Sequence, residues 1–149
     1  MGLLARRDYC TARLREKLAQ KHDIPEVEAA LARLTELRLL DDRAYAERFA
    51  RDRFERGGYG RHRIRRDLQQ RGIPDADIEA AIASELGEAG RLGEDGQDAE
   101  REAAARALQK FRRRPAGDDP AKRHQAEFRH LVTRGFPTAV VRDLLGVSL

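Results

Sequence analysis

The sequence HRIRRDLQQRGIPDADIEAAIASEL, residues 62–86, decides the fold. Ile64 and Leu68 lie one helical turn apart in its first half, and apolar residues repeat at the same spacing in its second half. Gly72 and Pro74 stand between the two halves. Glycine accepts the left-handed conformation that ends a helix, and proline suits the first turn of the next one. This stretch therefore predicts two helices joined by a short turn.

The same pattern occurs twice more, as ARLREKLAQKHDIPEVEAALARL at residues 12–34 and as QAEFRHLVTRGFPTAVVRDLLGV at residues 125–147. The corresponding apolar positions of the three copies are Leu18, Leu68 and Leu131, then Ile24, Ile73 and Phe136, then Val27, Ile78 and Val141. The first copy is shorter around its proline, and Glu127 replaces an apolar residue of the other copies. Internal repeats of this kind indicate a stacked array.

A further helix is predicted before each pair, at residues 3–8, 42–56 and about 98–113. The unit is then three helices used three times, and the predicted fold is all-α, with three tandem three-helix repeats stacked into an elongated, curved array. The predicted boundaries are 1–40 for the first repeat, 41–86 for the second, 87–97 for an acidic, glycine-rich loop, and 98–149 for the third. The alternative is one compact bundle with accidental internal similarity.

The composition restricts the class of protein. Of the 149 residues, 40% are hydrophobic, 38% are charged and only 5% are aromatic, and there is no tryptophan. Such a chain is a poor candidate for a thick β-sandwich or barrel core. No apolar run approaches the roughly 18 residues that a membrane span needs, and charges interrupt the first residues where a signal peptide would be apolar. We therefore expect a cytoplasmic protein that does not enter a membrane.

Charge is segregated along the chain, although its net value is only +4. Residues 49–71 hold 8 basic and 3 acidic side chains, residues 72–102 hold 2 and 10, and residues 103–149 hold 10 and 4. Clustered basic side chains attract phosphate or carboxylate surfaces, whereas an acidic block repels them. The ordinary alternative is that these blocks are only the solvated faces of helices.

Catalytic and metal-binding patterns are missing from the sequence. The four histidines have no helical i, i+4 spacing, and no serine lies in a nucleophile elbow. The segment Gly58-Tyr59-Gly60 is not a phosphate loop because no strand precedes it and no Gly-Lys-Ser/Thr follows. Asp41 and Asp42 fall where a helix begins, which favours capping over metal binding. We expect no catalytic residue, no metal and no cofactor.

The arginine-rich segment at residues 50–72 is the strongest binding candidate. With Ile64 and Leu68 buried, helical phase sends His62 and Arg66 outward, with Arg63 and Arg65 on the flanks. Guanidinium groups suit phosphates and carboxylates alike. The structural alternative is an ion pair of Arg63 or Arg71 with Asp67, which leaves other arginines unpaired. The candidate residues for binding a partner or DNA are Arg51, Arg53, Arg56, Arg61, His62, Arg63, Arg65, Arg66, Arg112, Arg113 and Arg114.

Arg112, Arg113 and Arg114 lie at the end of the helix predicted at 98–113. Cations at the C-terminus of a helix stabilise the helix dipole, so part of this arginine cluster has a structural explanation.

Three segments together form a specific pattern: LRLLDDRAYA at residues 37–46, GYGRHRIRRDLQQRGI at 58–73 and LVTRGF at 131–136. In these segments the chain resembles the RecX family, bacterial regulators of the RecA recombinase. The resemblance covers nearly the whole chain. One departure is Arg38, which stands where the family usually has glycine.

The resemblance implies an all-helical protein without enzymatic activity. Members of the family bind the RecA nucleoprotein filament in its helical groove, limit its growth and reduce its recombinase and co-protease activity, which makes them regulators of recombination and of the SOS response. We accordingly expect a monomer whose partner is the RecA filament, and whose arginines face either the phosphates of the single-stranded DNA within the filament or carboxylates of RecA. The alternative is a stand-alone single-stranded-DNA-binding helical module, which the scarcity of aromatic residues beside the arginines disfavours.

Overall fold

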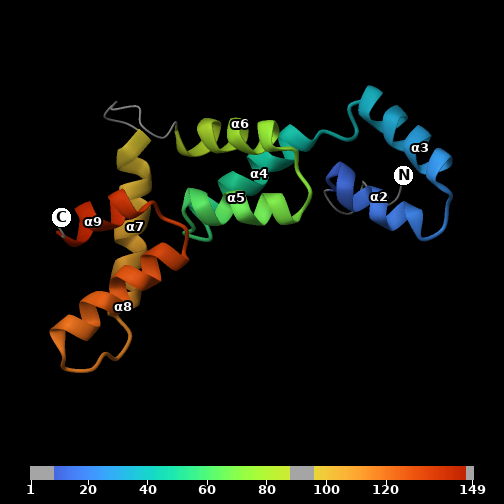
Figure 1. The fold of residues 1–149 in the computed structure, drawn as a ribbon. Coiled ribbons are helices and arrows are strands. Elements are labelled where there is room, and N and C mark those ends of the chain that lie inside the picture. The colour runs from blue at the N-terminus through green and yellow to red at the C-terminus, as the bar shows by residue number, and fades with distance from the viewer. Residues whose placement is uncertain (1–8, 88–95, 147–149) are drawn as a thin grey trace.

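The computed structural model describes residues 9–87 and 96–146, and the described residues form helices without any strand. The helices are α2 (Thr11–Ala19), α3 (Ile24–Glu36), α4 (Asp42–Glu55), α5 (Arg61–Gln70), α6 (Asp75–Leu86), α7 (Gly96–Arg112), α8 (Pro120–Thr133) and α9 (Thr138–Leu145) (Figure 1). The helix predicted at residues 3–8 and most of the predicted acidic loop lie outside the described residues. None of the helices just named is long and apolar enough to span a membrane.

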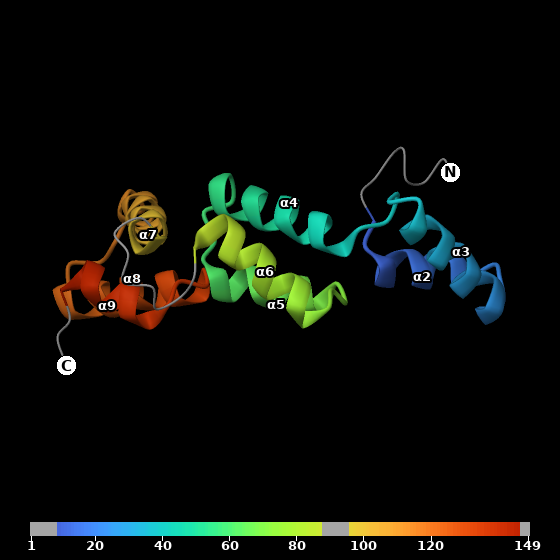
Figure 2. The same cartoon turned by 90° about the horizontal axis from the view of Figure 1, so that it is seen from above.

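The helices form three groups in an elongated row. Helices α2 and α3 lie at one end, α4, α5 and α6 in the middle, and α7, α8 and α9 at the other end (Figures 1 and 2). Within the middle group α4 and α5 both pack on α6, and within the last group α8 and α9 pack on each other and on α7. The predicted all-α repeat array is confirmed, with three helices each in the middle and last groups, and the single compact bundle is wrong.

Two hydrophobic cores hold the row together. The middle and last groups share one continuous core, which includes Ile64, Leu68 and Phe136. The first group has a small core of its own, built from Leu14, Val27, Leu31 and Leu40. Complete burial of such an aliphatic side chain stabilises the fold by about 1.5–3 kcal/mol. The apolar stripes that define the repeats in the sequence are therefore the faces that form these cores.

A turn of the last repeat docks on the start of α5 in the middle repeat. The backbone N–H of Gly60 donates to the carbonyl of Arg134 (2.9 Å), and that of His62 donates to the carbonyl of Gly135 (2.9 Å). A Cβ on Gly60 would lie 2.6 Å from the backbone of Gly135. The two backbones approach so closely that this position requires glycine.

The middle repeat docks on the first repeat in the same way. The turn after α5 meets the start of α2, where the Cys10 thiol donates to the carbonyl of Arg71 (3.3 Å). A Cβ on Gly72 would lie 2.6 Å from the Cβ of Ala12. One contact, an Arg-Gly turn against the start of the middle helix of the preceding repeat, thus joins both pairs of neighbours.

The two ends of the row differ from these junctions. Ile24 corresponds to the buried Ile73 and Phe136, but it is 76% exposed because α3 lies at the end of the row. At the other end, the side chain of Asp119 accepts hydrogen bonds from the backbone N–H groups of Ala121 (3.0 Å) and Lys122 (3.4 Å) at the start of α8. This cap satisfies two of the N–H groups in the first turn of α8, which have no partner within the helix.

Glu127, which departs from the repeat pattern, and Arg38, which departs from the family pattern, both have a structural explanation. Glu127 is buried, and its carboxylate accepts hydrogen bonds from the guanidinium of Arg112 at 2.8 and 3.1 Å. The hydrogen bonds from Arg112 lower the pKa of Glu127, so the carboxylate is charged at neutral pH. Arg38 has a φ of 56°, which is the left-handed conformation that glycine adopts most easily.

Small-angle scattering should confirm the extended shape. A compact protein of 149 residues has a radius of gyration of about 15 Å. We expect a clearly larger value, because three groups in a row place mass far from the centre. A measured value near 15 Å in dilute monomeric solution would contradict the row.

Candidate basic interface

Helix α5 presents its predicted binding residues as helical phase requires. His62 and Arg66 are exposed, and Arg63 and Arg65 are half-buried on the flanks. Partial desolvation of its ring, followed by the charge of Arg65, lowers the pKa of His62. His62 is therefore uncharged at neutral pH and adds nothing to the positive charge of this face.

Arg61 is not part of this exposed face. Its side chain is only 7% exposed, and its Nε donates to the carboxylate of Glu100 on α7 at 2.8 Å. A second nitrogen of the same guanidinium donates to the carbonyl of Gly87 at 3.1 Å. The expectation that Arg61 faces a partner is therefore wrong: a buried charge must be paired, and Glu100 pairs it inside the fold.

Several other predicted arginines form ion pairs on the surface. The pairs are Arg51 with Glu85 (2.8 Å), Arg56 with Asp52 (3.5 Å), Arg63 with Asp67 (3.2 Å) and Arg65 with Glu79 (2.6 Å). The hydrogen bond from Arg65 lowers the pKa of Glu79. Glu79 and Glu85 of α6 thus lie next to arginines of α4 and α5. A count of the acidic residues within residues 50–72 alone therefore underestimates how many of these arginines form ion pairs.

The three arginines at the end of α7 diverge. Arg112 binds Glu127, Arg114 lies over the ring of Phe111 at 5.8 Å, and Arg113 is exposed. The sequence places them together as one cluster, whereas the structure directs them to different surroundings.

A first hollow of about 240 Å³ lies between the first and middle repeats, and we call it the α4–α5 hollow. It is lined by four arginines and one carboxylate, with two aromatic rings among them. The lining residues are Arg13, Phe49, Arg53, Tyr59, Arg63, Asp67, Gln70 and Arg71. Positive charge therefore dominates this hollow.

Aromatic rings hold the arginines of the α4–α5 hollow in place. The guanidinium carbons of Arg53 and Arg71 lie 4.9 and 4.7 Å from the centre of the Phe49 ring. The guanidinium of Arg63 lies 5.4 Å from the centre of the Tyr59 ring. A guanidinium that contacts a ring in this way is attracted to the ring while its N–H groups can still reach an anion. Three of the four arginines of the hollow, Arg53, Arg63 and Arg71, are thus held against a ring.

A second hollow, of about 370 Å³, lies where the middle and last repeats meet, and we call it the junction hollow. Its charged lining residues are Glu55, Arg56, Arg106, Lys110, Arg114 and Arg134. His130 also lines it and stacks on Phe111 with the ring centres 4.4 Å apart. Burial, followed by Arg134 and Arg114, lowers the pKa of His130, so the histidine is neutral at neutral pH. Five permanent cations thus face one carboxylate.

Tyr59 connects the two hollows. Its ring, which Arg63 contacts from the α4–α5 hollow, is also contacted by Arg134 of the junction hollow, whose guanidinium lies 4.4 Å from the ring centre. Arg134 is held there by hydrogen bonds to the carbonyls of Gly57 and Gly58. The two hollows thus adjoin at Tyr59. We call their combined lining the basic track; its cations are Arg13, Arg53, Arg56, Arg63, Arg71, Arg106, Lys110, Arg114 and Arg134.

Sequence analysis missed Arg13, Arg71, Arg106, Lys110 and Arg134 of this track. Arg71 and Arg134 occupy the same position of the repeat, directly before the glycine of the docking turn. The alignment of the repeats was thus a usable signal for these two residues. Nothing in the sequence places the other three beside α5, because they come from helices α2 and α7.

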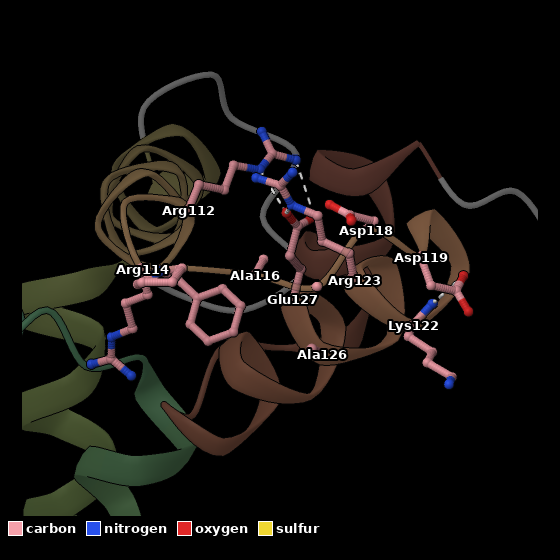
Figure 3. Close-up of a pocket in the computed structure, with 12 residues that line it drawn as sticks. Arg112, Arg114, Ala116, Asp118, Asp119, Lys122, Arg123, Ala126 and Glu127 are labelled. Atoms are coloured by element: carbon pink, nitrogen blue, oxygen red, sulfur yellow. Dashed lines mark hydrogen bonds and ion pairs between the residues drawn. The ribbon is translucent and has the colours of Figure 1, made fainter.

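A third hollow, of about 480 Å³, lies at the start of α8 and is a weaker candidate (Figure 3). Figure 3 shows Arg112 and Arg123 directed at Glu127, and Asp118 and Asp119 lie on the same loop. The positive charges are here largely balanced by carboxylates. In the described part of the chain no group of three or more histidine, cysteine or acidic residues could hold a metal ion.

Comparisons with known proteins identify relatives of the whole chain. The family model described as the second three-helix domain of RecX matches residues 41–82. A regulatory protein RecX of Pseudomonas syringae pv. tomato is 37% identical over 148 residues, which cover 97% of this chain and 86% of the relative. A regulatory protein RecX of Thermus thermophilus is also 37% identical, over 143 residues that cover 96% of this chain and 84% of the relative.

Solved structures show the same fold. The crystal structure of RecX from Lactobacillus salivarius superposes with a TM-score of 0.81 at 18% identity, covering 97% of this chain and 88% of that one. A second crystal structure, of a regulatory protein RecX, superposes with a TM-score of 0.77 at 23% identity and covers 99% of this chain and 69% of that one. At these identities the likeness concerns the fold alone.

Proposed function

Because this chain belongs to the RecX family of regulatory proteins, we propose that it binds the nucleoprotein filament of the RecA recombinase in the helical groove of the filament. Bound there, it inhibits filament extension and lowers the recombinase, ATPase and co-protease activities. It thereby modulates DNA repair, recombination and the SOS response. The observation that carries this proposal is the 37% identity to a regulatory protein RecX over 97% of the chain.

The elongated row of repeats supports this function. A filament presents identical protomers at regular intervals, and a row of similar units can contact several of them at once. In this mechanism the repeats, bounded as 1–40, 41–86 and 98–149, each contact a different protomer. The protein acts as a cytoplasmic monomer and without catalysis, since a regulator of this kind needs only to bind.

Binding to assembled filaments tests the proposal. Linked contacts raise the effective concentration of each repeat at its site, so we expect an affinity for ATP-assembled filaments on single-stranded DNA that exceeds the affinity for RecA alone by about 100-fold or more. Co-sedimentation measures binding, and the ATP hydrolysis rate of the filament measures inhibition. Filaments assembled to saturation leave no bare DNA, which controls for binding to DNA alone. Equal affinity for free RecA and filament, with unchanged ATP hydrolysis, would refute the proposal.

A stand-alone DNA-binding module is the second candidate function. The observation that favours it is the basic track, with nine permanent cations beside two carboxylates. Such a module would reduce RecA activity only by occupying single strands. Its effect would disappear when DNA is in excess, whereas a filament regulator would still inhibit.

A further inference from the structure

We propose that copies of this chain contact one another head to tail, with the turn between α2 and α3 of one copy docked in the third hollow, at the start of α8, of the next copy. We call residues 21–25 of this turn, all of which are exposed, the end turn. The end turn and the third hollow lie at opposite ends of the row of helices, so the contact can repeat from copy to copy (Figure 1). The contact is a property of the chain, and its role between copies bound in the filament groove rests on the proposed function.

The first support is that the end turn is equivalent to the two turns that join the repeats within the chain. Ile24 occupies the position of Ile73 and Phe136 in those turns. Ile73 and Phe136 are 4% and 1% exposed, whereas Ile24 is 76% exposed. The end turn thus keeps the apolar residue of a docking turn but leaves it in solvent, where its burial by another copy would be favourable.

The second support is the position of the third hollow on α8. In the middle repeat the docking turn meets Gly60, four residues before Ile64. The equivalent residue of the last repeat, four before Glu127, is Arg123. Arg123 and Glu127 both line the third hollow, which at about 480 Å³ is larger than the hollows of about 240 and 370 Å³ in the basic track. The third hollow therefore lies where the repeat pattern would place a further docking turn.

The third hollow can receive the side chain of Ile24. Its apolar lining residues are Phe111, Pro115, Ala116 and Ala126. Figure 3 shows Ala116 and Ala126 in the middle of the lining. Because each of these two side chains is a single methyl group, they leave room for a branched apolar side chain.

The charges of the two surfaces are complementary. Lys21 and Asp23 are the charged residues of the end turn beside its histidine, and Asp118 and Lys122 line the third hollow. None of these four side chains forms an ion pair or a hydrogen bond with a residue in the described part of the chain. Each surface thus offers one cation and one carboxylate that the fold does not use, which suits a contact with the other surface.

Two departures from the repeat pattern make this contact looser than the junctions within the chain. Asp23 stands where both docking turns have glycine, and the N–H of Arg123 already donates to the carbonyl of Asp119 at 3.0 Å. Side chains must therefore make the contact, without the close backbone approach seen at Gly60. Stable interfaces bury about 1,200–2,000 Å², far more than one turn can cover, so we expect a Kd of about 0.2 mM. Free chains are then monomers at micromolar concentration.

Binding in the filament groove strengthens this weak contact. Neighbouring copies held on one filament meet at an effective concentration of about 1 mM, so a contact with a Kd of about 0.2 mM tightens binding beside an occupied site about sixfold. Binding to the filament then becomes cooperative, and the copies gather in continuous runs.

Sedimentation equilibrium of the full chain without RecA tests the contact. We expect the weight-average mass to rise between about 0.02 and 1 mM, a range that brackets the expected Kd. The mass should pass that of a dimer, because a head-to-tail contact does not close on itself.

Two variants that keep the net charge locate the contact. Ile24→Gln removes the apolar residue of the end turn, and Ala126→Gln fills the middle of the third hollow. Each variant alone should stay monomeric, whereas an equimolar mixture should form dimers and nothing larger, because the intact hollow of one accepts the intact turn of the other. The matched control is Val132→Gln, which changes an exposed apolar residue outside both surfaces and should associate like the parent. Circular dichroism checks that all three variants keep the fold.

Co-sedimentation with ATP-assembled RecA filaments tests the role of the contact. The parent should give a steeper binding curve than Ile24→Gln or Ala126→Gln, and half-saturation should need about sixfold less protein. Equal curves for parent and variants would overturn this role.

Four results in solution would overturn the contact itself: a parent chain that stays monomeric to about 1 mM, association that stops at a dimer, a mixture of the two variants that stays monomeric, or loss of association in Val132→Gln. A chain that fails these tests but still binds and inhibits filaments retains the proposed function. A chain that associates head to tail but ignores filaments has lost that function and not this contact.

Discussion

The Glu100→Ala variant is expected to lose about 3–5 kcal/mol of unfolding free energy, because it leaves the guanidinium of Arg61 buried without a counter-charge. The two side chains are 7% and 3% exposed, so bulk solvent does not screen the guanidinium once the carboxylate is gone. Glu100 also accepts a hydrogen bond from the backbone N–H of Arg61 at 3.0 Å, so the start of α5 loses a partner as well. Such a loss is a large part of the 5–15 kcal/mol that stabilises a typical domain.

Urea denaturation followed by circular dichroism measures this loss. The matched control is Glu79→Ala, which removes a carboxylate from the more exposed pair with Arg65 and should cost at most about 1 kcal/mol. The double variant Arg61→Met/Glu100→Leu should recover much of the stability, since an apolar pair needs no counter-charge. If Glu100→Ala and Glu79→Ala cost the same, Arg61 is not a buried ion-pair partner and its exposure to a binding partner becomes tenable again.

The fold was predictable because it depends on local patterns that repeat. The spacing of Ile64 and Leu68 predicts the buried face of α5, and the structure buries both residues. Of the two equivalents of Leu68, Leu131 is buried and Leu18 is half-buried. The helix predicted at 42–56 is observed at Asp42–Glu55. Asp41 caps that helix, as predicted, through a hydrogen bond from Ala44 at 3.1 Å. Each of these features involves residues only a few positions apart.

The binding surface was less predictable because its contacts join distant parts of the chain. Arg61 and Glu100 are 39 residues apart and belong to different charge blocks, so the sequence shows two charges where the structure has one neutral pair. Arg106 and Arg13 reach the track only because the repeats stack on each other. The charge count along the sequence identified the arginine-rich segment at residues 50–72. Only the packing of the repeats shows which arginines lack an ion-pair partner in the described part of the fold.

The junction between the middle and last repeats also gives a large expected effect. Gly135 has a φ of 94°, and a Cβ there would lie 2.3 Å from the backbone nitrogen of Arg63. In Gly135→Ala the left-handed conformation should cost about 1–2 kcal/mol, and the clash with α5 a further 1–3 kcal/mol or so. We therefore expect an unfolding free energy lower by about 2–5 kcal/mol in urea denaturation.

Two other glycines separate the two contributions. Gly146 has a φ of 71° but open space around its Cβ position, so Gly146→Ala should show the conformational cost alone. Gly60 has a φ of −88°, yet its Cβ would lie 2.6 Å from the backbone of Gly135, so Gly60→Ala should show the clash alone. The cost of Gly135→Ala should then approach the sum of the other two. If it only equals that of Gly146→Ala, the last repeat does not press against α5. Tyr59 and Arg134 would in that case not be held together across the junction, and the two hollows would be separate sites.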